Sequence, residues 1–83
     1  MIGKRHDLTD GDGVLEQGEY GKTQSGIWFA RVPAPGFGMG SLSAHDVTEH
    51  ADGTITVSPS ILCTGHFDKQ WHGWLIKGVW TEA

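Results

Sequence analysis

The last third of the chain shows the clearest alternation of apolar and polar positions. Residues 70–76 (QWHGWLI) predict a strand in which His72, Trp74 and Ile76 share one face, while Trp71 points to the other. Lys77-Gly78 then predicts a turn and residues 79–81 a short final strand, whereas residues 64–69 predict a loop. We therefore expect an antiparallel arrangement in this region.

The strand before it is expected over residues 54–63, with an edge or a bulge at Pro59 because proline cannot donate to a ladder. Residues 41–52 are open to two interpretations. Ser43 and Asp46 have the spacing of a helix capping box, whereas Asp52-Gly53 before a strand indicates a hairpin. A three-residue loop over 51–53 with a left-handed Gly53 would set Val47 opposite Val57 and Glu49 opposite Ile55. A two-residue loop would instead set Val47 against Ser58, so we prefer the three-residue loop, which pairs apolar with apolar at Val47 and Val57. We favour the hairpin over the helix.

The first half of the chain has weaker patterns. Residues 14–20 predict a short strand, and residues 26–32 (GIWFARV) predict a central strand because both of its faces are largely apolar. Pro33 ends that strand. The loop over 33–40 (PAPGFGMG) holds Phe37 and Met39 between glycines, either tucked under the core or presented to a partner. Residues 1–13 are polar and are expected to be loose at their start.

Composition limits the fold to one small domain. The chain has 83 residues, and 13 of them are glycines, which favour turns and close approaches and leave little room for helix. We expect an all-β fold, a compact antiparallel barrel or sandwich of about five or six short strands with glycine-rich loops. So short a chain buries a small core, and self-association would add an interface to it.

The net charge and the number of cysteines limit the classes of partner and the cellular compartment that we expect. The net charge is −4 and the six basic residues are scattered, which argues against nucleic acid as a partner. No apolar run approaches the length of a membrane span, and the N-terminus has no apolar stretch of a secretory signal. A single cysteine excludes an internal disulfide, so a reducing cytoplasm is the expected setting.

An acidic turn near the N-terminus has the partial spacing of a calcium loop. Asp10, Asp12, Gly13 and Glu19 fall at the third, fifth, sixth and twelfth positions of such a loop. Leu8 would occupy the first ligand position, where it cannot coordinate a metal. We therefore favour a solvated acidic turn.

Cys63, His66 and His72 form the candidate metal site. A thiolate and two imidazoles are ligands that zinc takes, with His45 or His50 as a fourth. The spacing is not that of a standard finger, and the alternative is a buried cysteine acting as a small hydrophobe beside two ordinary histidines. Cys63 with a histidine base is also a conceivable nucleophile, but no catalytic signature surrounds it. We expect no cofactor, with zinc as the alternative, and lean against an enzyme.

The aromatic residues are numerous for so small a chain. Trp71 and Trp74 lie on opposite faces of one strand. Either at least one ring lies in a second core, at an oligomer interface or on a ligand surface, or a thin two-layered fold buries both rings. The candidate binding residues, taken from this strand, the loop before it and the glycine-rich loop, are Phe37, Met39, Phe67, Trp71 and Trp74.

Two segments carry a family resemblance. Ser58-Pro59-Ser60-Ile61-Leu62 and, after a loop, residues 72–78 (HGWLIKG) resemble a family of uncharacterised small proteins of bacteriophages and prophages. In that family a Ser-Pro-Ser-Ile-Leu strand precedes a Cys-His pair, apolar residues and an Asp-Gly turn. Here the pair reads Trp71-His72 and the turn Lys77-Gly78. Family members often carry a further Cys-x-x-Cys-like segment of the kind that binds zinc, which this chain lacks, and only His72 matches a ligand position.

The resemblance implies a viral or prophage accessory protein acting in the host cytoplasm. We expect a non-enzymatic protein that binds a host protein, such as a component of a defence system, or a small signalling molecule, and that forms a homo-oligomer. The alternative is a zinc-binding structural domain or small metallo-hydrolase using Cys63, His66 and His72. A weaker alternative is a structural component of the virion.

Overall fold

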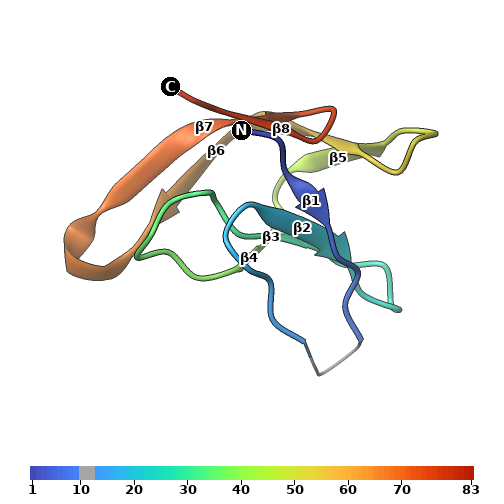
Figure 1. The fold of residues 1–83 in the computed structure, drawn as a ribbon, viewed down its shortest axis with the longest axis horizontal. Helices are drawn as coiled ribbons and strands as arrows, with labels where there is room; N and C mark the ends of the chain where they lie inside the picture. Colours follow the sequence, from blue (N-terminus) through green and yellow to red (C-terminus); the bar gives the residue numbers. More distant parts are fainter. Residues whose placement is uncertain (10–12) are drawn as a thin grey trace.

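The protein consists of two small β-sheets, seen in a computed structural model that describes residues 1–9 and 13–83 (Figure 1). The strands of the first sheet, in spatial order, are β1 (Lys4–Arg5), β2 (Glu19–Lys22), β3 (Trp28–Ala30) and β4 (Gly40–Ser41). Those of the second sheet are β5 (Asp46–Glu49), β6 (Ile55–Thr64), β7 (Gln70–Ile76) and β8 (Val79–Glu82). The all-β prediction is confirmed, with more strands than expected and without closure into a barrel.

The second sheet is an antiparallel meander, and its first hairpin follows the predicted register. Val47 lies opposite Val57 and Glu49 opposite Ile55. Gly53 has φ of 89°, a left-handed conformation that costs glycine little, and Asp52 Oδ1 accepts hydrogen bonds from the Thr54 amide and hydroxyl. The hairpin is therefore confirmed, and the alternative helix over residues 43–51 is wrong.

The prediction of an irregularity at Pro59 is also confirmed. The register between β6 and β7 shifts between Val57 and Ile61, and the Ser58-Pro59 peptide bond is cis. Beyond the shift, Leu62 lies opposite His72 and Cys63 opposite Trp71. Residues 66–68 form a short 3-10 turn (η1, His66–Asp68) at the tip of the β6–β7 hairpin.

The first sheet departs further from the sequence-based expectation. β3 is central, as predicted, but the strand expected over residues 14–20 begins only at Glu19. Leu15 is nevertheless fully buried, and its carbonyl accepts a hydrogen bond of 3.0 Å from the Arg31 guanidinium. The Arg31 side chain thus stabilises residues around Leu15 as a loop. The local alternation of apolar and polar residues does not predict this contact.

The N-terminal residues are ordered into the fold rather than loose. β1 runs parallel to β2, and Ile2 forms an antiparallel bridge with Val79 of β8. The Gly3 amide donates to the Gly78 carbonyl at 2.7 Å, and the Met1 ammonium donates to the Trp80 carbonyl at 3.0 Å. Both partners lie far away along the chain, so no local pattern predicts this pairing. The hypothesis of an acidic turn at Asp10 and Asp12 falls outside the described residues.

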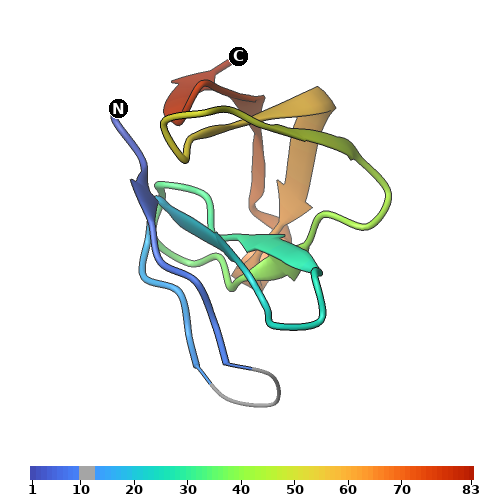
Figure 2. The same cartoon turned by 90° about the vertical axis from the view of Figure 1, so that its right-hand side faces the viewer.

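The N-terminal segment joins the two sheets along one side by backbone pairing, while the described residues form no such pairing on the opposite side. There β4 and β5 belong to different sheets, and residues 42–45 connect them (Figure 2). We call this side the seam.

The core lies between the sheets and draws on both. Trp71 and Trp80 pack edge to face, with ring centroids 5.6 Å apart at 83°, and the Trp80 indole donates to the buried Gly18 carbonyl. The buried cluster consists of Tyr20, Ala30, Val32, Phe37, Leu42, Ile55, Val57, Ile61, Trp71, Leu75 and Trp80. In the described part of the chain, no helix has the length and apolar character needed to cross a membrane.

Candidate functional site

The outer face of the second sheet is the candidate site, and strand alternation creates it. Along β7 the residues alternate between exposed and buried, so that Trp71, Gly73 and Leu75 face the first sheet. His72, Trp74 and Ile76 point the other way, as the sequence predicted. The inner face of β7 is covered by the core, whereas the outer face carries large side chains in contact with solvent.

A row of apolar residues crosses this outer face, with His72 between Trp74 and Leu62. Ile2 lies opposite Val79, and Val79 lies opposite Ile76. Directly opposite residues in antiparallel strands share a face, and Trp74 follows on the same face of β7. The exposed fractions are 81% for Ile2, 41% for Val79, 50% for Ile76, 37% for Trp74 and 63% for Leu62. We call these five residues the outer apolar row.

Polar groups interrupt the row near its Leu62 end. The His72 Nε2 atom lies 2.9 Å from the Ser60 hydroxyl, and the His72 and Trp74 rings lie 5.8 Å apart and tilted by 41°. His72 in turn lies opposite Leu62. The hydrogen bond and the ring contact restrict both rings, so the face presents Trp74 in a defined position. A pre-positioned aromatic ring with a polar neighbour is typical of a protein-binding surface.

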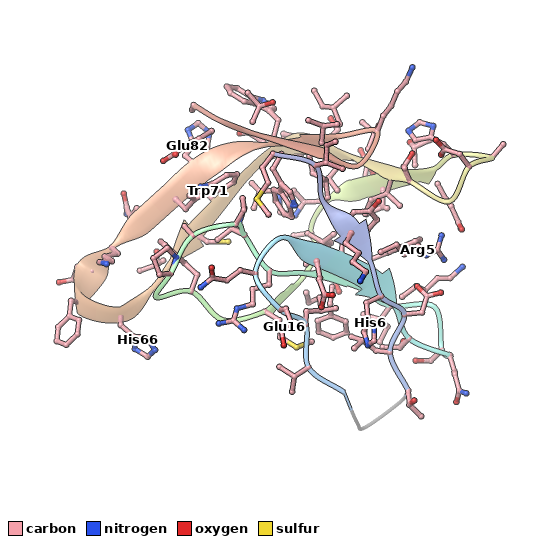
Figure 3. All side chains as sticks on the ribbon, in the orientation of Figure 1. Arg5, His6, Glu16, His66, Trp71 and Glu82 are labelled. Atoms are coloured by element: carbon pink, nitrogen blue, oxygen red, sulfur yellow. The ribbon has the colours of Figure 1, made fainter. Side chains whose placement is uncertain are left out.

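Two of the five predicted binding residues lie in the core instead. Phe37 is 5% and Trp71 4% exposed. Phe37 packs against the backbone at Gly65, where any side chain would clash with its ring. Trp71 lies between the sheets against Trp80 (Figure 3). The glycine-rich loop thus tucks Phe37 under the core, and neither ring is available to a partner in the folded protein.

The other three predicted residues are accessible to different degrees. Trp74 belongs to the outer apolar row, and Met39 is half-buried in the glycine-rich loop. Phe67 is 98% exposed at the hairpin tip, where its backbone is left-handed with φ of 59°. The structure therefore keeps Trp74, Met39 and Phe67 on the surface without gathering them into one site.

The predicted metal trio does not converge. Cys63 lies opposite Trp71 and faces inward, whereas His72 lies on the outer face, so the sheet separates these two side chains. His66 is exposed at the hairpin tip, away from Trp71 (Figure 3). Within residues 1–9 and 13–83, no group of three His, Cys, Asp or Glu side chains could hold a metal ion, a finding that includes His45 and His50. The short sequence spacing failed here because strand alternation sends neighbouring ligands to opposite faces.

The environment of Cys63 also opposes its use as a nucleophile. Burial raises the pKa of the Cys63 thiol above its ordinary value. The thiolate is the reactive form, so a raised pKa lowers reactivity at neutral pH. His72, the histidine on the facing strand, points to the other side of the sheet.

A charged cluster between the sheets escaped the sequence analysis. The Arg5 guanidinium donates to both carboxylate oxygens of Asp7 at 2.9 and 3.2 Å and to Glu49 at 2.7 Å, between β1 and the β5–β6 hairpin (Figure 3). Lys22 pairs with the other Glu49 oxygen at 3.4 Å, and both cations lie over the Trp28 ring. These hydrogen bonds lower the pKa of the Asp7 and Glu49 carboxyls. The cluster combines residues up to 44 positions apart, so no local sequence motif predicts it.

The seam carries a shallow groove of about 320 Å³. Its apolar lining comes from Ile27, Trp28, Leu42 and Val47, with Gly26, Ser43 and His45 completing it. The His45 Nε2 atom lies 3.3 Å from the Ser60 carbonyl, and its Nδ1 is buried. This groove is a concave feature, in contrast to the flat outer face, and lies on the side of the molecule where the described strands of the two sheets are not paired.

Comparisons of the chain with family models, with curated proteins and with solved structures gave no match. The geometry of the two surfaces therefore carries the functional inference.

Proposed function

We propose that the protein is a non-enzymatic accessory protein that binds a partner protein through the outer apolar row. The observation that carries this proposal is the row that Ile2, Val79, Ile76 and Trp74 form on one sheet face, with Leu62 on the same face beyond His72. Single exposed apolar residues are ordinary on protein surfaces, but a continuous patch marks an interaction site. Trp74 is its anchor, because partly exposed tryptophans are enriched among the residues that dominate binding energy.

The shape of the face favours a macromolecule over a small ligand. Small-molecule sites are concave and enclose most of their ligand, whereas the outer row lies on the open surface of a sheet. A flat apolar strip with a polar margin suits another protein surface. A small signalling molecule, the other partner expected from the sequence, is therefore the weaker candidate at this face.

The bacteriophage origin in this proposal rests on the family resemblance, and the structure adds a point in its support. The two resembling segments, residues 58–62 and 72–78, lie on the adjacent strands β6 and β7, with Leu62 opposite His72. The shared pattern thus contributes Leu62, Trp74 and Ile76 to one surface. In this proposal the partner is a protein of the host cytoplasm, such as a component of a defence system; a role in the virion is the alternative.

Capture experiments with three variants test the proposal. The tagged wild-type protein, Trp74→Ala/Ile76→Asp and the control Val14→Asp are expressed in a bacterial host, and co-purified proteins are quantified by mass spectrometry. Val14 is 72% exposed and lies outside the row, so the control changes an apolar residue elsewhere. We expect the wild type and the control to retain one stoichiometric partner that the double variant loses. Equal capture by all three proteins, or no stoichiometric partner, would contradict the proposal.

A further inference from the structure

The outer edge of β5 presents unpaired backbone groups toward the seam. The His50 amide donates to the Thr54 carbonyl, so alternation directs the backbone groups of Thr48 and Asp46 toward β6 as well. The backbone N–H and C=O groups of Val47 and Glu49 therefore point away from β6. Among the strands that the structure describes, β6 is the single neighbour of β5. This edge can accept one more strand.

The groove at the seam continues the space between the sheets beyond β5. Val47 packs against the core and Glu49 bonds to residues of the first sheet, so both side chains lie on the inner face of β5. The inner-face side chains of an added strand would lie on the same side of the sheet as the groove lined by Ile27, Trp28 and Leu42. A strand on this edge would thus satisfy the backbone groups and border the groove.

We infer that a second copy of the chain supplies this strand, with β5 pairing antiparallel to β5 about a two-fold axis at Thr48. In this register Val47 of one copy meets Glu49 of the other, and these are the residues whose backbone groups point outward in both copies. The backbone pattern is therefore self-complementary, as a two-fold interface requires. If the register slipped by one residue, the outward-pointing N–H and C=O groups of one copy would lie opposite residues of the other copy whose backbone groups point toward β6. The hydrogen bonds between the copies would then be lost.

Charge complementarity supports the same register. On the outer face of the paired strands, Asp46 of each copy lies opposite His50 of the other, and Thr48 lies opposite Thr48. Asp46 and His50 form a non-hydrogen-bonded pair in the new ladder, where side chains come closest. The His50 Nε2 atom already lies 2.7 Å from the Thr56 hydroxyl, which restricts the ring and leaves Nδ1 as the nitrogen that can meet the Asp46 carboxylate.

Glu49 does not prevent the pairing, although inward-pointing charges often protect sheet edges. Arg5 and Lys22 of the same copy bind its two carboxylate oxygens at 2.7 and 3.4 Å. The charge that faces the incoming strand is thereby already compensated. Because β5 is only four residues long, the paired edges bury little surface, and we expect a weak dimer.

The inference deepens the expected self-association of the protein and is independent of the partner on the outer apolar row. Sedimentation velocity from micromolar to millimolar concentration, with native mass spectrometry, tests it on the wild type, Thr48→Lys, Thr48→Glu and their mixture. Thr81→Lys, on the outer face opposite Trp74, is the control for association through the row. Circular dichroism verifies the fold of each variant.

We expect a concentration-dependent wild-type dimer that either Thr48 variant weakens about tenfold or more, since like charges would face each other across the axis. Mixing Thr48→Lys with Thr48→Glu should give a heterodimer at least as stable as the wild-type dimer, and Thr81→Lys should leave dimerisation unchanged. A wild-type monomer at millimolar concentration would overturn the inference. So would a mixture without heterodimer, or a dimer that Thr81→Lys breaks and Thr48→Lys does not. Partner capture by the Trp74 variants is measured separately, so either proposal can fail alone.

Discussion

The two faces of β7 carry two tryptophans with opposite surroundings. Trp71, on the inner face, is 4% exposed and packs edge to face against Trp80, whereas Trp74, three residues later, is 37% exposed and borders solvent. Both belong to the same strand and differ only in the side of the sheet to which they point. Trp71 therefore contributes to folding, while Trp74 offers a surface.

The comparison teaches that alternation divides a strand into two faces without revealing which face is covered. The first sheet and the glycine-rich loop cover the inner face, through Tyr20 and Phe37 in the same buried cluster as Trp71. The described elements leave the outer face open. The energetic cost of changing residues should differ sharply between these faces, and the following experiments measure that difference.

The largest loss of stability is expected for Trp71→Ala. Removing a buried aromatic ring costs about 3–5 kcal/mol of unfolding free energy, through lost burial and the remaining cavity. Urea denaturation followed by circular dichroism measures the change. A loss below about 1 kcal/mol would contradict the placement of Trp71 in the core.

Gly73→Ala tests the inner face between Trp71 and Leu75. A Cβ atom at this position would collide with the Thr81 carbonyl and the Trp71 ring. Overpacking of this kind costs about 1–3 kcal/mol, because a strand or a ring must shift. The midpoint of urea denaturation should fall accordingly. Gly38→Ala is the matched control, since a Cβ atom there meets open space.

Arg5→Met tests the charged cluster that connects the two sheets. The change removes hydrogen bonds to Asp7, Glu49 and the Gly53 carbonyl but keeps much of the apolar stem beside Trp28. The cluster is partly exposed, so we expect a loss of about 1 kcal/mol. Thermal denaturation checks the change, and unaltered stability would show that solvent screens these contacts fully.

Acid should reduce the advantage of the wild type over Arg5→Met. Hydrogen bonds from Arg5 lower the pKa of Asp7 from its ordinary value of 3.8 and that of Glu49 from 4.5. Groups with a depressed folded-state pKa stabilise the protein above their ordinary pKa and lose this contribution as the pH falls through the folded-state pKa. The Tm difference between the two proteins should therefore be constant near neutral pH and shrink below about pH 5. A difference that grows in acid would contradict the pairing.

The smallest effect on stability is expected for Trp74→Ala on the outer face. We expect a loss of about 0.5–1 kcal/mol, because the ring keeps only partial contacts in the folded state. Urea denaturation beside Trp71→Ala sharpens the comparison between the faces. Equal losses for both variants would mean that Trp74 is a structural residue and would remove the anchor from the proposed binding surface.

Local signals predicted the second sheet well. The β5–β6 hairpin followed from a glycine at the left-handed turn position and from the Val47–Val57 pairing, both of which are encoded within a dozen residues. The irregularity at Pro59 followed from the missing amide donor. These features depend on neighbours close in sequence, so a single chain carries enough information to place them.

Contacts between distant segments explain what the sequence did not predict. The N-terminal segment pairs with β2 through β1 and with Val79 through Ile2, and the Arg5–Glu49 pair connects segments 44 residues apart. The metal trio failed for a related reason, because residue spacing gave proximity along the chain but the sheet placed Cys63 and His72 on opposite faces. Of the candidate binding residues, Trp74 could be placed on its strand from the pattern, while the coverage of Trp71 and Phe37 depended on the other sheet.

The bridge between Ile2 and Val79 also orders events during synthesis on the ribosome. Residues 1–3 are made before their partners at residues 78–80, so the side of the fold that they join cannot close until both segments have been synthesised. Until then β1 can pair with β2 alone. Such long-range pairing slows folding, because a large loop must close, at a cost in chain entropy, before the stabilising contacts form. The pairing of residues 1–3 with residues 78–80 is therefore a late step of folding, and residues 1–3 stay accessible to chaperones until it occurs.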